Sequence, residues 1–253
     1  MNWITELHQR NNALAWYSWV TLLGGIICLV LSKTTAIQIN NINAFVKPTK
    51  FFFSVCIFCL TMGWIGYELH QPNVMNLYNI VLIVVMSFEL FVITWQAANG
   101  RLSHFNISKP LYSTLFSLMG VAISILTLHT AYLGYLFFKI DNLNIPMGYL
   151  WGIRLGIILF VIFAFEGGIM GAKLQHTVGA ADGSNGIAFL NWSKHYGDLR
   201  IAHFLGMHSL QLLPLLGFYV FKNPAGIIAF AIVYFGFVVY NLVIALRGLA
   251  LFK

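Results

Sequence analysis

Ionisable side chains concentrate in one stretch of this chain, residues 166–214. It contains four of the eight histidines and three of the seven acidic residues: His176, His195, His203, His208, Glu166, Asp182 and Asp198. A carboxylate beside an imidazole can exchange a proton with a substrate, and the same side chains can bind a transition metal. We therefore expect the functional site in this stretch.

The rest of the chain is strongly apolar. Hydrophobic residues make up 59% of the sequence and charged residues 8%, whereas a soluble domain carries about 25% charged residues. A bilayer is the medium that suits such a composition, and within it the backbone must form helices or a closed barrel. Because the apolar runs are long and do not alternate, the sequence predicts an all-α integral membrane protein.

Seven apolar runs are long enough to cross a bilayer, which takes about 20 residues per helix. We expect the spans at 13–31, 51–69, 77–98, 111–138, 148–171, 201–221 and 226–246. A short interfacial segment, 1–12, precedes them, and a long connector, 172–200, joins the fifth span to the sixth. Since no repeat or composition change interrupts the pattern, we expect residues 1–253 to form a single domain, a bundle of seven transmembrane helices.

The basic residues are divided unevenly between the two ends of these spans. Of the 14 Lys and Arg residues, ten fall on the side of the connector 172–200 and of the C-terminus. By the positive-inside rule, that side is cytoplasmic and the N-terminus lies outside, as in a bacterial inner membrane. The basic residues form no dense run, so we expect the lipid bilayer and no nucleic acid as the charged partner.

A few polar side chains lie inside the expected spans. Glu89 and Gln96 share a face of the span 77–98, Glu166 lies in the span 148–171, and His208 and Gln211 lie in the span 201–221. Ionisable residues within a membrane mark functional sites by default. We predict a polar pocket open to the cytoplasm, in which Glu166 and His208 are the acid/base pair, Glu89 is a third catalytic residue, and Gln96 and Gln211 bind substrate.

The cytoplasmic connectors would form the mouth of this pocket. We expect further substrate contacts from Arg101, His104, His176, Asp182, Asp198 and Arg200. Two simpler interpretations stay open: the cations satisfy the positive-inside rule, and Asp198 caps the helix that follows it.

The histidines also suggest a metal or a haem. Glu166, His203 and His208 are suitable ligands for zinc or iron. However, His203 and His208 are five residues apart, about 140° around a helix, so binding one ion would distort that helix. A haem-binding electron carrier would use histidines at two depths, and His70 and His129 supply an outer level, but no pair of histidines is repeated at matching depth.

The backbone of the fifth and sixth spans has two distinctive features. Gly148, Gly152 and Gly156 form overlapping G-x-x-x-G units, which allow close helix packing either within the chain or between chains. Pro214 should kink its span and free a carbonyl group one turn earlier. A homo-oligomer or a larger membrane complex is therefore compatible with the sequence.

Taken together, these features favour a membrane-embedded enzyme acting on a small lipid-soluble or amphipathic substrate, with or without a divalent metal. A transporter or channel with Glu89 and Glu166 on an ion or proton path is the main alternative. A haem protein and a structural subunit of a membrane complex are two further alternatives. The sequence resembles no family whose motifs would decide between them.

Overall fold

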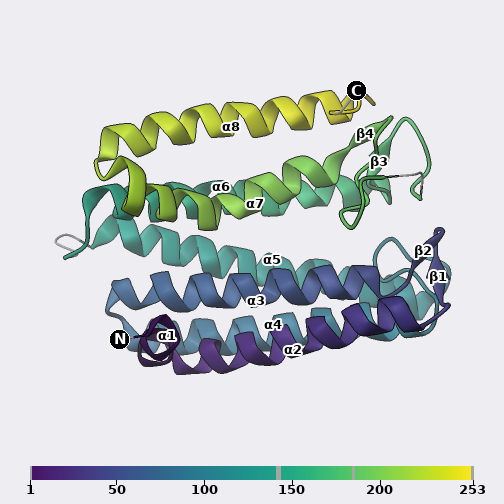
Figure 1. Cartoon of the computed structure of the whole chain (residues 1–253), viewed down its shortest axis with the longest axis horizontal. Coiled ribbons are helices and arrows are strands. Elements are labelled where there is room, and N and C mark those ends of the chain that lie inside the picture. The colour runs from purple at the N-terminus through teal and green to yellow at the C-terminus, as the bar shows by residue number, and fades with distance from the viewer. Residues whose placement is uncertain (1, 141–143, 184–185, 252–253) are drawn as a thin grey trace. The chain divides into compact units, whose positions relative to one another are not determined.

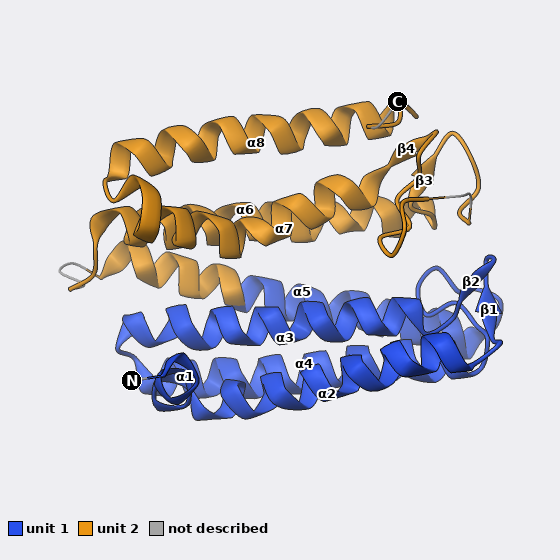
Figure 2. Cartoon of the chain, viewed as in Figure 1, with its two compact units in different colours: residues 1–129 blue, residues 130–253 orange. Residues whose placement is uncertain are grey.

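The computed structural model describes residues 2–140, 144–183 and 186–251. In these residues, seven helices are long and apolar enough to cross a membrane, and the only strands are four pairs of residues. The chain divides into two compact units, residues 1–129 and 130–253 (Figure 2). The predicted class, an all-α polytopic membrane protein with seven spanning helices, is confirmed.

Unit 1 contains three complete spanning helices and the first part of a fourth (Figure 1). Its elements are α1 (Trp3–Arg10), α2 (Asn12–Thr34), β1 (Gln38–Ile39), β2 (Ile42–Asn43), α3 (Val46–Gly66), a 3-10 turn (Tyr67–Leu69), α4 (Pro72–Ala98) and the start of α5 (Pro110–Lys139). Asparagine side chains cap the first two helices: Asn2 accepts from Ile4 N, and Asn11 accepts from Leu14 N.

The short helix α1 occupies the segment predicted to be interfacial. Leu7 is buried, and the Arg10 guanidinium bonds Glu6 at 2.7 Å and Glu68, in the 3-10 turn that follows α3, at 2.6 Å. Burial by itself lowers the pKa of Arg10, but the hydrogen bonds and charges of Glu68 and Glu6 raise it above its ordinary value. Arg10 therefore stays charged and fastens α1 to the end of the α3 span.

Unit 2 contains the remaining spans and the long connector. Its elements are the end of α5, α6 (Met147–Lys173), β3 (Thr177–Val178), β4 (Gly197–Asp198), α7 (Leu199–Leu216), a π-helical turn (Gly217–Phe221) and α8 (Pro224–Leu246). β3 pairs antiparallel with β4, with Thr177 opposite Asp198. The connector is therefore closed at its base by a two-stranded ladder and lies at the end of α6 and α7 (Figure 1).

Glycines bring α6 and α7 into backbone contact. A Cβ atom on Gly152 would lie 2.4 Å from the Leu213 carbonyl oxygen, and one on Gly156 would lie 3.0 Å from that of Ser209. The Ser209 hydroxyl donates to the Gly156 carbonyl at 3.1 Å. The G-x-x-x-G face is thus used for packing within this chain.

Pro214 lies inside α7 and is followed by the π-helical turn. A proline removes a backbone donor, and a π-helical turn absorbs the resulting mismatch in the hydrogen-bond ladder. Gly217 opens that turn against the backbone of Gly148 in α6. The irregularity predicted for this span therefore takes the form of a π-helical turn packed on α6.

The predicted spans agree with the helices to within five residues. The differences of five residues are at two N-termini, where α3 begins at Val46 and α4 at Pro72, and at the C-terminus of α7, which ends at Leu216 before the π-helical turn. Prolines suit the first turn of a helix, because the amide hydrogen they lack has no partner there. In α3, Pro48 and Thr49 are already buried, so the helix begins before its apolar run. The first turns of α3 and α4 contain polar residues, and for that reason an apolar run alone placed both helix starts too late. The single domain and the orientation remain predictions.

Candidate functional site

Glu166 of α6 and His203 of α7 lie together in unit 2. His203 Nδ1 is 2.7 Å from the Phe163 carbonyl oxygen and 3.4 Å from Glu166 Oε2. A carbonyl oxygen can only accept, so Nδ1 carries the hydrogen, and Nε2 of the neutral ring has the free lone pair. Gly167 makes room for the ring, because a Cβ atom there would lie 2.7 Å from His203 Cε1.

The Glu166 carboxyl group is buried and poorly satisfied. The residue is 7% exposed, and both carboxyl oxygens lack a hydrogen-bond partner in the part of the chain that the structure describes. The 3.4 Å approach to His203 is an electrostatic contact only, because the Nδ1 hydrogen is directed at Phe163. An unsatisfied buried carboxyl group is costly to keep, which is typical of a functional group.

His208, the predicted partner of Glu166, has different neighbours. Its Nδ1 is 3.0 Å from Gln211 Oε1, and its ring centroid is 4.2 Å from that of Phe204. Relative to His203 it is displaced by about 7.5 Å along α7 and by about 140° around it. The structure thus places His203 beside Glu166. His208 contacts Gln211 instead, on another face of α7.

The structure does not support the predicted zinc or iron site. Among the described residues, no group of three or more His, Cys, Asp or Glu side chains is placed to hold a metal ion. Glu166 and His203 are adjacent, but the hydrogen on Nδ1 directs that nitrogen to the Phe163 carbonyl. His208 faces Phe204 and Gln211, because α7 is a regular helix at this point.

In the connector, His176 and Asp182 close a small loop. The Asp182 carboxylate accepts from His176 N at 3.0 Å and Thr177 N at 2.9 Å, and its Oδ2 lies 2.8 Å from His176 Nδ1. Burial alone would raise the pKa of Asp182. The hydrogen bonds and charge of His176 and the hydrogen bond from Thr177 outweigh burial and lower that pKa to well below its ordinary range. Asp182 is therefore ionised and holds β3 at the end of α6.

This ion pair makes the connector sensitive to acid. The pKa of Asp182 is lower in the folded than in the unfolded chain. The stabilisation that ionised Asp182 gives the fold is therefore complete above the ordinary pKa of 3.8 and declines as the pH falls below that value. We expect Asp182→Asn to weaken amide exchange protection at Thr177 at neutral pH, by roughly 1–3 kcal/mol. In the wild type, the same protection should fall only in acid. Equal protection in both proteins at neutral pH would contradict this role.

Asp198 and Arg200 form the second ionic group of the connector. Asp198 caps α7 by accepting from Arg200 N at 3.1 Å, as one interpretation of the sequence predicted, and it also accepts from Ser193 N at 2.8 Å. The Arg200 guanidinium bonds both Asp198 oxygens, at 2.9 and 2.6 Å, and the Asn191 carbonyl at 2.6 Å. Both side chains therefore organise the connector, and substrate binding by them stays a prediction.

Unit 1 contains the other half of the predicted pocket. Glu89 and Gln96 lie two helical turns apart on one face of α4, at 6% and 1% exposure. The Oε1 atom of each is buried and has no hydrogen-bond partner within the described ranges. Lys47, at the start of α3, interacts electrostatically with Glu89. Unit 1 thus has a polar site of its own. Of the residues predicted to line one pocket, Glu89 and Gln96 belong to unit 1, whereas Glu166, His208 and Gln211 belong to unit 2.

Arg101 and His104 pack among aromatic rings of unit 1. The Arg101 guanidinium donates to the Tyr112 hydroxyl and lies 5.2 Å from the centroid of that ring. The His104 ring lies 5.7 Å from that of Phe51 and 6.1 Å from that of Phe116. These contacts order the connector between α4 and α5, and their predicted role in substrate binding is untested.

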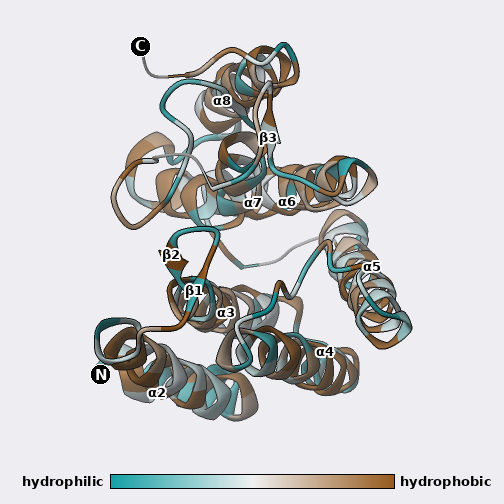
Figure 3. Cartoon of the chain, turned by 90° about the vertical axis from the view of Figure 1, so that its right-hand side faces the viewer, coloured by the Kyte–Doolittle hydropathy of each residue, from teal (hydrophilic) through white to brown (hydrophobic). Residues whose placement is uncertain are grey.

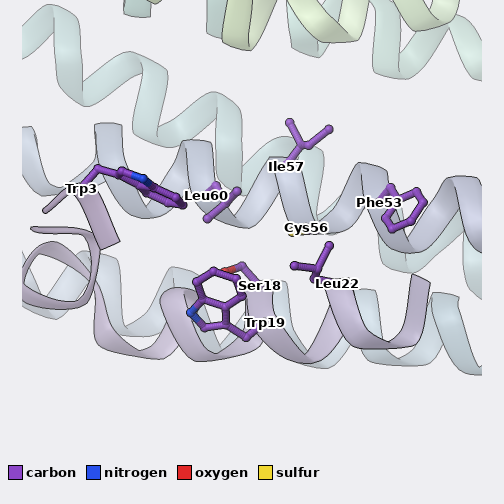
Figure 4. A pocket seen from close by; sticks show the side chains of 8 residues that line it. All are labelled: Trp3, Ser18, Trp19, Leu22, Phe53, Cys56, Ile57 and Leu60. Atoms are coloured by element: carbon purple, nitrogen blue, oxygen red, sulfur yellow. The ribbon is translucent and has the colours of Figure 1, made fainter. Parts of the chain in front are cut away.

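Unit 1 also has an apolar groove of about 310 Å³ on α1, α2 and α3 (Figure 4). Its lining residues are Trp3, Ser18, Trp19, Leu22, Phe53, Cys56, Ile57 and Leu60. None of them can act as an acid, base or metal ligand at neutral pH except the buried thiol of Cys56. The groove therefore supplies mainly apolar contact area, in contrast to the Glu166–His203 pair.

Comparisons of this chain with models of protein families, with curated proteins and with solved structures found no match. The class that the fold defines is a polytopic membrane protein. The candidate site is the Glu166–His203 pair, together with two features that sequence reasoning missed. These are the Phe163 carbonyl, which fixes the histidine tautomer, and Gly167, which makes room for the ring.

Proposed function

We propose that this protein is a membrane-embedded enzyme that uses Glu166 and His203 to move a proton on a small lipid-soluble or amphipathic substrate. The observation that carries this proposal is the 3.4 Å approach of His203 Nδ1 to a buried carboxylate with two unpartnered oxygens. Because the hydrogen on Nδ1 is directed at the Phe163 carbonyl, the lone pair of Nε2 is free to accept a proton from a substrate and return it, with the Glu166 carboxyl group beside the ring.

The surroundings of the pair favour an amphipathic substrate. The pair lies within two helices that qualify as membrane spans, near the ends that enter the connector. A substrate with an apolar portion could remain in the bilayer while its polar group reaches His203. The count of ten basic residues against four supports an orientation with this end of the spans in the cytoplasm, as we expect for a bacterial inner membrane.

A turnover experiment tests the enzyme directly. The purified protein is reconstituted into liposomes made from the total lipid extract of its source membrane, and the lipids are compared by mass spectrometry before and after incubation. We expect one component to be depleted and a product to appear. If the lipid profile with protein matches that of empty liposomes, and addition of the soluble cell extract changes nothing, the proposal fails.

Glu89 favours a second candidate function, an ion or proton path. Its Oε1 atom is buried within α4 and has no hydrogen-bond partner among the described residues, and Lys47, at the start of α3, interacts electrostatically with it. On this alternative, liposomes containing the protein and an internal pH indicator should acidify after an external acid pulse. Glu89→Gln should abolish the flux, whereas Glu6→Gln, in α1, should leave it intact. Equal flux in protein-free liposomes would exclude the path.

A further inference from the structure

The connector contains a small hairpin, residues 186–193, with an apolar tip. Gly186 and Ser193 form an antiparallel bridge, and within it Ile187 N donates to the Trp192 carbonyl at 2.9 Å. At the tip, Phe189 is 52% exposed and has a φ of 66°. A left-handed conformation at a bulky residue is strained, and here the strained residue presents its ring outward.

Two contacts fix this hairpin beside the first turns of α7. The Asn191 carbonyl accepts from Arg200 at 2.6 Å, and the Trp192 ring lies 5.5 Å from that of Phe204. Phe204 is five residues past the start of α7, a rise of about 7.5 Å into that span. The hairpin thus lies alongside the end of a spanning helix, at the level where tryptophan is enriched at membrane interfaces.

The charges around the hairpin are positive. Lys194 directly follows it and Lys173 ends α6, and both side chains are exposed. The two acids of the connector are occupied: Asp182 binds His176, and Asp198 binds Arg200. The exposed charge at this end of unit 2 is therefore basic, which complements an anionic surface.

From the exposed tip, its level on α7 and the flanking cations, we propose that the 186–193 hairpin inserts Phe189 into the interface of a bilayer that contains anionic phospholipid. Phe189 enters the boundary between head groups and acyl chains, and Lys194 contacts lipid phosphates. This proposal is independent of the proposed enzyme activity.

Spin labelling tests the insertion. In a background with Cys28, Cys56 and Cys59 replaced by Ala, nitroxides are attached at Phe189→Cys and, as a lipid-facing reference, at Val233→Cys in α8, where the native residue is 72% exposed. The protein is placed in nanodiscs of phosphatidylcholine alone or with phosphatidylglycerol. Collision rates with oxygen, which partitions into lipid, and with a water-soluble nickel chelate are then compared.

We expect the oxygen-to-nickel ratio at position 189 to approach that at position 233 when phosphatidylglycerol is present, and to be lower in phosphatidylcholine. Lys194→Gln should weaken the effect of phosphatidylglycerol about fivefold, as expected for one lysine at an anionic surface. A label more accessible to nickel in both bilayers would place the tip in water and overturn the proposal. An oxygen-to-nickel ratio that indicates insertion but changes neither with phosphatidylglycerol nor with Lys194→Gln would overturn the role of anionic lipid.

Discussion

Gly152→Ala should destabilise the protein, whereas Gly168→Ala on the same helix should stabilise it. A Cβ atom on Gly152 would lie 2.4 Å from the Leu213 carbonyl oxygen and 2.8 Å from Pro214 Cα. These are backbone atoms, so α6 and α7 must separate to admit the methyl group. Overpacking of this kind costs about 1–3 kcal/mol, and here it also weakens the packing that supports the Glu166–His203 pair.

Gly168 is the matched control because nothing lies within 4 Å of a Cβ atom built there. Alanine at an open helical position gains about 0.5–1 kcal/mol over glycine. Thermal unfolding in detergent, followed by tryptophan fluorescence, should therefore show shifts of opposite sign for the two variants. Shifts of the same sign and size would mean that the α6–α7 contact is looser than the structure shows.

The spanning helices could be predicted because each needs only a long apolar run, a property of local sequence. The partner of Glu166 could not be predicted in the same way. Glu166 lies seven residues before the end of α6, while His203 and His208 lie four and nine residues after the start of α7. Depth alone does not choose between them. The choice depends on rotation about the helix axes, which the glycine contacts between α6 and α7 determine.

For the connector, too, only part of the structure could be predicted from the sequence. Its Gly, Asp and Asn content predicted a loop, and the helix cap that the sequence left open as an alternative for Asp198 is present. The binding of Asp182 by His176 and the anchoring of Asn191 by Arg200 depend on how the chain returns on itself through β3 and β4. Sequence patterns carry no signal for contacts of this kind, so these two pairings within the connector could not be predicted from the sequence.

The second large effect concerns the acid/base pair. Glu166→Gln and His203→Ala should each lower the rate of turnover by about 10²–10⁴, the usual contribution of a positioned acid or base. The Glu166 substitution retains size and removes charge, so the fold should survive. His208→Ala should have a smaller effect than His203→Ala, because His208 is bound to Gln211 on another face of α7. Glu6→Gln, in α1 of unit 1, is the control for a carboxylate that binds only Arg10.

The most direct test is therefore the rate at which wild type, Glu166→Gln, His203→Ala and Glu6→Gln convert the depleted lipid component, measured by mass spectrometry in liposomes at equal protein content. Loss of conversion in the Glu166 and His203 variants, with wild-type conversion in the Glu6 variant and a cooperative thermal unfolding transition retained in all four proteins, is the predicted result. Wild-type conversion by Glu166→Gln or by His203→Ala would contradict the assignment of this pair as the acid and base.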